Sequence, residues 1–309
     1  MGKTRKIVIT GAGGFIGKTL LSSINSSQFA VTALVRRIDP TIDASIKQYA
    51  IEDLTNCCPV QLSRIMTSAD YLIHLAAVVP GKHTTTKSNM TQDLARVVAG
   101  AAAAANIQRI IVLSSVYAEL AEQGSAQARK YGHEKQLADR IFHEMMPKAD
   151  IIFLRPPVVY GSGMTGSLLT LAKLVAKNIW LPLGSADSER TYVSARNLVD
   201  LLLTLIKAEQ LQWNAANRGK YVPTDGVAVS TIELINAIAA GLNVRPRTVP
   251  IPLWVLRLAG RVSGKTELIS GAIDPLHLND NNLLHRDFGW VPKEVFPECY
   301  KSWATSVIV

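Results

Sequence analysis

The chain has 309 residues, 48% of them hydrophobic, and its 33 Lys and Arg outnumber its 24 Asp and Glu for a formal net charge of +9. This length supplies about two domains with enough apolar surface for a large core, which excludes disordered and collagen-like proteins. The longest apolar run, residues 198–206, is interrupted by Asp200, and residues 1–6 are not followed by the apolar segment of a secretion signal. We therefore expect a cytoplasmic protein without a membrane span.

The cysteines and the basic residues exclude further classes. Cys57, Cys58 and Cys299 match neither a disulfide framework nor the spacing of zinc ligands, so we expect reduced thiols and no metal. The basic residues are scattered and form no long run, which argues against a nucleic-acid partner. Small anionic ligands are the remaining explanation for the positive charge.

The first half of the chain alternates short β-branched runs with helical patterns. Buried strands are predicted at residues 6–10, 30–35, 71–75, 107–113 and 151–154, and helices at 17–27, 91–105 and 132–146. This order predicts an α/β fold with a Rossmann-type, doubly wound parallel sheet. We assign residues 1–160 to this dinucleotide-binding domain. Residues 161–309 are less regular and predict a smaller, interleaved C-terminal substrate lobe, some segments of which return to the sheet.

A glycine-rich turn follows the first predicted strand. Gly11, Gly14 and Gly17 allow a tight turn and close approach of a diphosphate to the backbone at the start of a helix, although position 16 is not the glycine of the strict motif. The same stretch approximates a P-loop through Lys18 and Thr19. No later predicted strand ends in an Asp placed to hold Mg²⁺, which argues against an ATPase or GTPase. A second near-match, residues 259–266, follows a helical run and not a strand.

The end of the second predicted strand bears on the choice of cofactor. An acidic residue there would bind a ribose, whereas an arginine would accept a 2′-phosphate. Arg36 and Arg37 occupy this place, which favours NADPH; the alternative is that both are solvated surface charges.

A second cluster indicates acid–base chemistry. Tyr131 and Lys135 are four residues apart and share one face of a predicted helix, where the ammonium favours the phenolate form that acts as a base. Ser114 and Ser115 end a predicted strand, at the edge of the sheet where a hydroxyl could hold a substrate oxygen.

Together these motifs resemble a known family. The similar segments are the three glycines, residues 74–77, 113–115, Tyr131 with Lys135, and residues 155–161, 181–184, 190–193, 197–199 and 288–292. Their order and spacing resemble the extended short-chain dehydrogenase/reductases, that is, the NAD-dependent epimerase/dehydratase family, over nearly the whole chain.

The resemblance implies roles for individual residues. Tyr131 would be the general acid/base, Lys135 would bind the nicotinamide ribose, and Ser115 would hydrogen-bond the reacting oxygen, with Ser114 as the alternative. The NAD(P)-binding residues would be Gly11, Gly14, Phe15, Ile16, Gly17, Arg36, Arg37, Asp53, Leu54, Leu75, Ala76, Ala77, Tyr131, Lys135 and Pro157. The substrate would contact Ser115, Tyr160 and Arg190, the last at its diphosphate.

The sequence departs from the family pattern at two places. The asparagine usual at the start of the alanine-rich helix falls on Thr91, with Asn89 two residues earlier. The usual second diphosphate-binding arginine has no clear equivalent, so Arg261 or Lys265 would have to substitute. The spacing between Ser115 and Tyr131 is short, which predicts a trimmed loop. We interpret His74 as a packing residue and His133 and His143 as solvated helix positions.

The leading hypothesis is hydride transfer at C4 of a nucleotide-linked hexose, most simply a UDP-sugar, by an epimerase or a 4-ketoreductase that supplies sugars for surface polysaccharides. Arg36 and Arg37 favour the reductase, and the family favours the epimerase. The alternative from another class is a sensor or scaffold that binds NAD(P) without catalysis. The family also allows a homodimer.

Overall fold

The computed structural model describes residues 4–77 and 89–308, and the chain divides into two compact units. The first unit contains residues 1–157 together with Val199–Pro223 and Asn282–Trp290. The second unit contains Val158–Leu198, Thr224–Asn281 and Val291–Val309. The chain therefore crosses from one unit to the other several times, and late segments return to the first unit.

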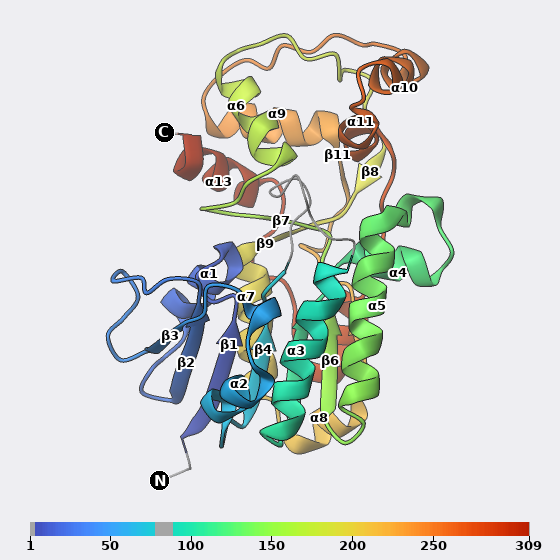
Figure 1. The fold of residues 1–309 in the computed structure, drawn as a ribbon. Helices are drawn as coiled ribbons and strands as arrows, with labels where there is room; N and C mark the ends of the chain where they lie inside the picture. Colours follow the sequence, from blue (N-terminus) through green and yellow to red (C-terminus); the bar gives the residue numbers. More distant parts are fainter. Residues whose placement is uncertain (1–3, 78–88, 309) are drawn as a thin grey trace. The chain divides into compact units, whose positions relative to one another are not determined.

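A seven-stranded parallel sheet forms the centre of the first unit (Figure 1). Its strands are β1 (Arg5–Thr10), β2 (Phe29–Val35), β3 (Lys47–Ala50), β4 (Tyr71–His74), β5 (Arg109–Leu113), β6 (Asp150–Leu154) and β10 (Lys220–Tyr221), in the order β10-β6-β5-β4-β1-β2-β3. The order reverses direction at β1, where β4 lies on one side and β2 on the other. This topology confirms the predicted Rossmann-type fold and places the switch point beside the glycine-rich turn.

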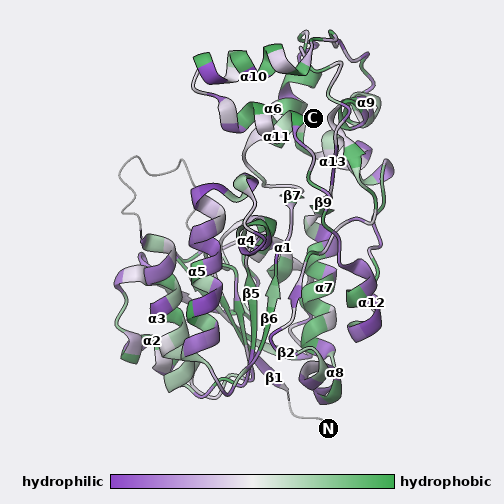
Figure 2. Ribbon diagram, turned by 90° about the vertical axis from the view of Figure 1, so that its right-hand side faces the viewer, coloured by the Kyte–Doolittle hydropathy of each residue, from purple (hydrophilic) through white to green (hydrophobic). Residues whose placement is uncertain are grey.

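Helices cover both faces of this sheet (Figure 2). The helices of the first unit are α1 (Phe15–Ser23), α2 (Pro59–Met66), α3 (Met90–Ala104), α4 (Val116–Glu122), α5 (Arg129–Met145), most of α7 (Ala195–Lys207), α8 (Gln210–Ala215) and most of α12 (Asn281–Phe288). Buried side chains of α2, α3 and α5 share one core with alternate residues of the strands. The alanines of α3 allow this helix to pack closely, because their small side chains keep the backbones near each other.

The segment between β5 and α5 differs from the expected trimmed loop. It forms α4 and a short 3-10 helix, Ala126–Ala128, and so is mostly helical. Ser115 caps α4 by accepting a hydrogen bond from the backbone N–H of Tyr117 at 3.3 Å. A serine in front of a helical run is a favourable N-cap, and this signal explains why the helix begins there.

The second unit contains two small sheets and several helices. Strand β7 (Val158–Tyr160) pairs in parallel with β9 (Tyr192–Ser194), and β8 (Glu189–Arg190) pairs in antiparallel with β11 (Val229–Ser230). Its helices are α6 (Ser167–Ala176), α9 (Thr231–Gly241), α10 (Leu253–Val262), α11 (Thr266–Ile273) and α13 (Glu298–Ile308), besides the start of α7. No helix in the described part of the chain is long and apolar enough to span a membrane.

Candidate active site

The glycine-rich turn connects β1 to α1 and approaches the end of β4. Gly11 has φ +71°, and a Cβ built there would lie 2.6 Å from the backbone N of Ala76. A Cβ on Gly17 would lie 2.5 Å from the carbonyl oxygens of Gly11 and Ala12. Any larger residue at these two positions would force the backbone apart. The structure therefore brings the predicted cofactor residues Gly11, Gly17 and Ala76 together.

The start of α1 suits an anion. Gly14 is the N-cap and supplies no side-chain hydrogen bond, and the first turn of the helix carries no acidic residue. Free N–H groups and the helix dipole at such an end favour a phosphate. Phe15 and Ile16, the first two residues of the helix, are half-buried, whereas Gly14 is exposed.

The P-loop alternative does not fit this turn. The Thr19 hydroxyl donates to the carbonyl oxygen of Phe15 at 3.0 Å within the helix, and the Lys18 ammonium pairs with Asp39 at 2.7 Å. Both side chains that a P-loop would turn toward phosphate and Mg²⁺ have other partners. The second near-match joins α10 to α11 and has no strand before it.

Arg36 and Arg37 are exposed directly after β2. Asp53 caps the 3-10 helix Leu54–Asn56, and it accepts from the backbone N–H and the hydroxyl of Thr55. The hydrogen bond from the Thr55 hydroxyl is the main cause that lowers the pKa of Asp53, and the positive charge of Arg36 adds to it. The structure thus brings Arg36 and Asp53, two of the residues predicted to bind the cofactor, within electrostatic reach of each other.

The predicted catalytic residues come from two adjacent helices. Ser115 begins α4, and Tyr131 and Lys135 lie in α5. The ring of Tyr131 meets the ring of Tyr117 edge to face, with centroids 6.1 Å apart. A Cβ on Gly132 would lie 2.3 Å from the carbonyl oxygen of Tyr117. Glycine at this position allows α5 to approach α4, which keeps Tyr131 near the start of α4.

The two serines have different partners. The Ser114 hydroxyl donates to Asp139 at 2.9 Å, and both groups are buried. Ser115 accepts the backbone N–H of Tyr117, which leaves its hydroxyl proton for another acceptor. This difference favours Ser115 over Ser114 as the residue that holds a reacting oxygen.

His74 lies at the end of β4 and is buried. Its Nδ1 lies 2.7 Å from the hydroxyl oxygen of Thr10, and its ring packs on Phe142. Burial, with the positive charge of Lys135 as a second cause, lowers the pKa of His74 to about 3, so the ring is neutral at physiological pH. His74 is a packing residue, as predicted, and His133 and His143 are exposed, as predicted.

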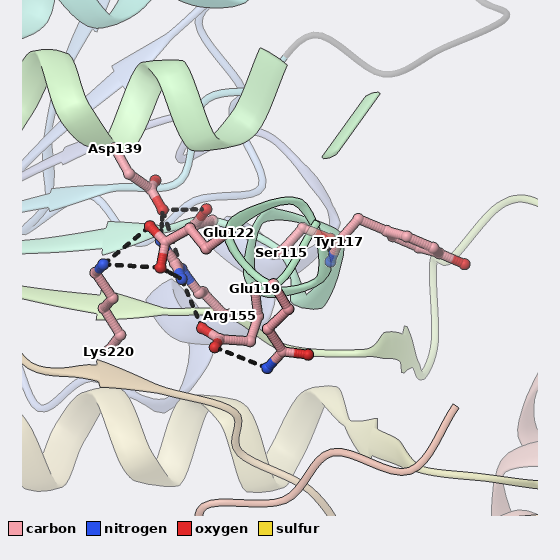
Figure 3. Close-up of polar contacts among 9 residues, drawn as sticks. Ser115, Tyr117, Glu119, Glu122, Asp139, Arg155 and Lys220 are labelled. Atoms are coloured by element: carbon pink, nitrogen blue, oxygen red, sulfur yellow. Dashed lines mark hydrogen bonds and ion pairs between the residues drawn. The ribbon is translucent and has the colours of Figure 1, made fainter. Parts of the chain in front are cut away.

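A charge network centred on the buried Arg155 joins α4 and α5 to the sheet (Figure 3). Arg155, which follows β6, is fully buried and pairs with Glu119 at 2.6 Å, Glu122 at 2.8 Å and Asp139 at 2.8 Å. Lys220 pairs with Glu122 at 2.8 Å. The network ties β6, α4, α5 and β10 to one another. No sequence motif indicated a role for Arg155 or Asp139, although Asp139 continues the face of Tyr131 and Lys135 by one more helical turn.

Burial raises the pKa of Asp139, whereas the charge of Arg155 and the Ser114 hydrogen bond oppose this shift. The hydrogen bond from Arg155 is the main cause that lowers the pKa of Glu122 to about 2. A cation that contacts three carboxylates satisfies charges that would otherwise be costly to bury.

Two predicted substrate residues lie in the second unit and are buried. The Tyr160 hydroxyl donates to Asp225 at 2.7 Å, and its ring stacks on Tyr300 at 4.2 Å. Arg190 in β8 donates to the carbonyl oxygen of Asp274. The single O–H of Tyr160 is therefore used inside the unit, whereas Arg190 has further N–H donors.

The remaining predicted residues are placed as follows. Leu54, Leu75 and Ala77 are half-buried and Pro157 is buried; Thr91 is buried in the first turn of α3, and Arg261 and Lys265 are exposed at the end of α10 and just after it. Among the described residues, no group of three or more His, Cys, Asp or Glu side chains could hold a metal ion.

Residues 7–216 match the NAD dependent epimerase/dehydratase family. The chain belongs to this family. Membership confirms the resemblance and identifies the chain as an NAD(P)-dependent enzyme. A UDP-glucose 4-epimerase of Vibrio cholerae is 26% identical over 328 aligned residues, which cover 98% of this chain and 96% of that protein.

A GDP-6-deoxy-D-talose 4-dehydrogenase of Aggregatibacter actinomycetemcomitans is also 26% identical, over 65% of this chain and 70% of that protein. Among solved structures, a Bordetella bronchiseptica enzyme in complex with NAD⁺ has a TM-score of 0.73 at 14% identity and covers 99% of this chain and 98% of that one. This likeness supports the fold.

Proposed function

We propose that the chain oxidises or reduces C4 of a nucleotide-linked hexose, with a UDP-sugar as its substrate, either as a 4-epimerase or as a 4-ketoreductase. The observation that carries this proposal is that Ser115 caps α4 just beyond the carboxyl end of β5, while Tyr131 and Lys135 lie in the first two turns of α5 and the ring of Tyr131 meets Tyr117 of α4. Two curated relatives, named for UDP-glucose and for a 4-dehydrogenase, support chemistry at C4.

The glycine-rich turn fits a dinucleotide. The absence of side chains at Gly11 and Gly17 and the uncapped start of α1 leave backbone N–H groups for a diphosphate. Arg36 would accept a 2′-phosphate, Asp53 would contact the adenine, and Lys135 would hold the nicotinamide ribose. When bound, the nicotinamide supplies reversible uptake of a hydride.

The chain's own residues would handle the proton. Tyr131 would give a proton to the C4 oxygen during reduction and remove it during oxidation. The Ser115 hydroxyl donates to the same oxygen and orients it. Arg190 would bind the substrate diphosphate, because the carbonyl oxygen of Asp274 accepts from one of its N–H groups and the guanidinium has others to donate. Tyr160 has no substrate contact in this proposal, because its hydroxyl donates its one hydrogen bond to Asp225.

The decisive experiment replaces Tyr131 with Phe. Turnover of UDP-glucose with NAD⁺, or of a UDP-4-keto-hexose with NADPH, should fall about a hundredfold to ten-thousandfold. Tyr117→Phe is the matched control, because it removes the hydroxyl of the neighbouring ring and should leave turnover within a few-fold. Equal turnover by Tyr131→Phe and the parent would refute the catalytic assignment. Cofactor binding without turnover in the parent would identify a sensor.

The cofactor of the purified protein separates the two reactions. Tightly retained NAD⁺ would identify an epimerase, and reversible uptake of NADPH would identify a reductase, which Arg36 and Arg37 favour. The paired change of Arg36 and Arg37 to Ser should weaken the binding of NADPH about tenfold or more beyond its effect on the binding of NADH. Arg64→Ser, at an exposed position on α2, should change neither. We further propose that the reaction takes place in the cytoplasm and supplies sugars for surface polysaccharides.

A further inference from the structure

An exposed apolar stripe runs along α10 in the second unit. Trp254, Leu258 and Val262 are 67%, 52% and 83% exposed, and their spacing of four residues places them on one side of the helix. The opposite side holds the helix in place, because Leu256 is buried and Gly260 lies close to Ile269 of α11. Single exposed apolar residues are ordinary, but an aligned stripe of this kind marks an interaction surface.

Basic residues flank the stripe, and acidic residues are absent from its segment of the sequence. Residues 244–266 contain Arg245, Arg247, Arg257, Arg261 and Lys265 but no Asp or Glu. All five are exposed. Figure 2 shows hydrophobic and hydrophilic bands alternating along α10. On the helix, Arg257 and Arg261 follow Trp254 and Leu258 by three residues, so they border the stripe. Arg257 already pairs with Asp274 at 3.0 Å, so the net positive charge beside the stripe comes chiefly from Arg261, Lys265, Arg245 and Arg247.

The segment before α10 and the segment around Leu181 that pairs with it also place an exposed aromatic side chain beside a basic one. The guanidinium of Arg247 lies over the ring of Trp180 at 5.7 Å, and Trp180 is 61% exposed. The backbone of Leu181 pairs with this segment through Arg247 and Val249. A second exposed aromatic side chain thus stands beside a basic residue in the same unit.

The combination of charge and apolar side chains selects the partner. A symmetric dimer through α10 would bring the same arginines of two copies face to face, and like charges would oppose it. Nucleic acid would pair with the arginines but would leave the Trp, Leu and Val side chains without an apolar environment. An anionic bilayer satisfies both, because its phosphates attract Arg and Lys while its acyl boundary accepts the apolar stripe.

We propose that α10 docks this protein on the surface of an anionic lipid bilayer, with Trp254, Leu258 and Val262 inserted at the headgroup level. The docking is peripheral and reversible, since the stripe is only three residues long. It does not depend on the proposed C4 chemistry.

The test uses the full chain in sedimentation with vesicles of pure phosphatidylglycerol or of pure phosphatidylcholine. The chain should sediment with the anionic vesicles and not with the neutral ones, and added NaCl should release it because salt screens the charges. The paired change Leu258→Ser and Val262→Ser should reduce the partition by about tenfold or more. Leu211→Ser, at a leucine of α8 that is 79% exposed, is the matched control and should leave the partition unchanged.

Three results would overturn the proposal. The first is a parent that does not sediment with phosphatidylglycerol vesicles, and the second is a Leu211→Ser change that reduces the partition as much as the stripe variant does. The third result is a parent that binds no vesicles but self-associates, with the self-association abolished in the stripe variant. Urea midpoints of all variants, compared with that of the parent, separate lost docking from lost folding. Trp254→Phe adds a spectroscopic reading: the parent's fluorescence should shift to the blue on vesicles, and this shift should shrink in the variant.

Discussion

Two buried aspartates show how differently the two units handle a carboxylate. Asp139 in the first unit is 4% exposed and accepts from the guanidinium of Arg155. Asp225 in the second unit is 3% exposed, and the donors that the described structure gives it are neutral: the Tyr160 hydroxyl, the Asn197 amide and the backbone N–H of Ser194. The first is compensated by charge, and the second by hydrogen bonds.

This difference follows from what each carboxylate joins. Asp139 lies one helical turn beyond Lys135, where buried positive and negative charges must balance near the proposed reaction site. Asp225 joins the end of β9 to the start of α7, which needs aligned acceptors but no charge. Burial raises the pKa of both aspartates, that of Asp225 to about 6, but only at Asp139 does a neighbouring cation, Arg155, oppose the rise. At Glu122, which is less buried, the hydrogen bond from Arg155 outweighs burial and lowers the pKa to about 2.

The largest expected effect comes from Arg155→Met. The change leaves three carboxylates without their common cation, and removal of one partner from a buried pair costs about 3 to 5 kcal/mol. Urea unfolding should show this loss in the free energy of unfolding. Arg196→Met is the control, because Arg196 is 80% exposed and its pair with Glu294 at 3.4 Å should be worth less than about 1 kcal/mol. Similar losses in both variants would show that burial of the charge does not matter.

Glu122 provides the next effect, through pH. Its pKa is lower in the folded chain than in the unfolded one, so its contribution to stability is present above about pH 4.5 and is lost as the pH falls toward 2. Glu122→Gln does not titrate. The parent should therefore lose about 2 kcal/mol more than the variant over this range, allowing for the partial exposure of the side chain. Parallel stability curves for the two proteins would contradict the assignment.

The contribution of Asp225 to stability should depend on pH in the opposite direction. Its pKa is higher in the folded chain, so its contribution is present below about pH 4 and is lost as the pH rises through 6. Asp225→Asn keeps an oxygen for Ser194 and Asn197 but cannot titrate. Between pH 4 and 7 the variant should therefore gain about 2 kcal/mol relative to the parent. A constant difference between the two unfolding free energies would mean that Asp225 is as well compensated as Glu122.

The comparison also explains what the sequence could predict. The parallel sheet was predictable because buried strands of a doubly wound sheet are short β-branched runs. Strand β3 was missed because its sequence, Lys-Gln-Tyr-Ala, is largely polar, and β10 because it has only two residues. The position of the glycine turn between β1 and α1, and of Tyr131 and Lys135 on one helix, was predictable because both follow from local spacing.

The networks around Asp139 and Asp225 depend on contacts between distant segments, which no local pattern shows. Arg155 meets Glu119 across 36 residues, and Tyr160 meets Asp225 across 65. The predicted substrate contact of Tyr160 shows the same limit, because a motif position does not reveal that the Tyr160 hydroxyl donates to the buried Asp225. For Asp139, the sequence offered one signal: it is an acidic residue one helical turn beyond Lys135, on the same face of the helix.

Tyr160→Phe should have the smallest effect and decides between two roles for this side chain. The change removes one of the neutral donors to Asp225, which should lower the free energy of unfolding by about 1 kcal/mol at neutral pH. The KM for a UDP-sugar should not change, because the hydroxyl faces Asp225. In combination with Asp225→Asn, the effects of the two changes on the free energy of unfolding should be non-additive, since both alter the same hydrogen bond. A raised KM with unchanged stability would restore the substrate contact that the sequence predicted for Tyr160.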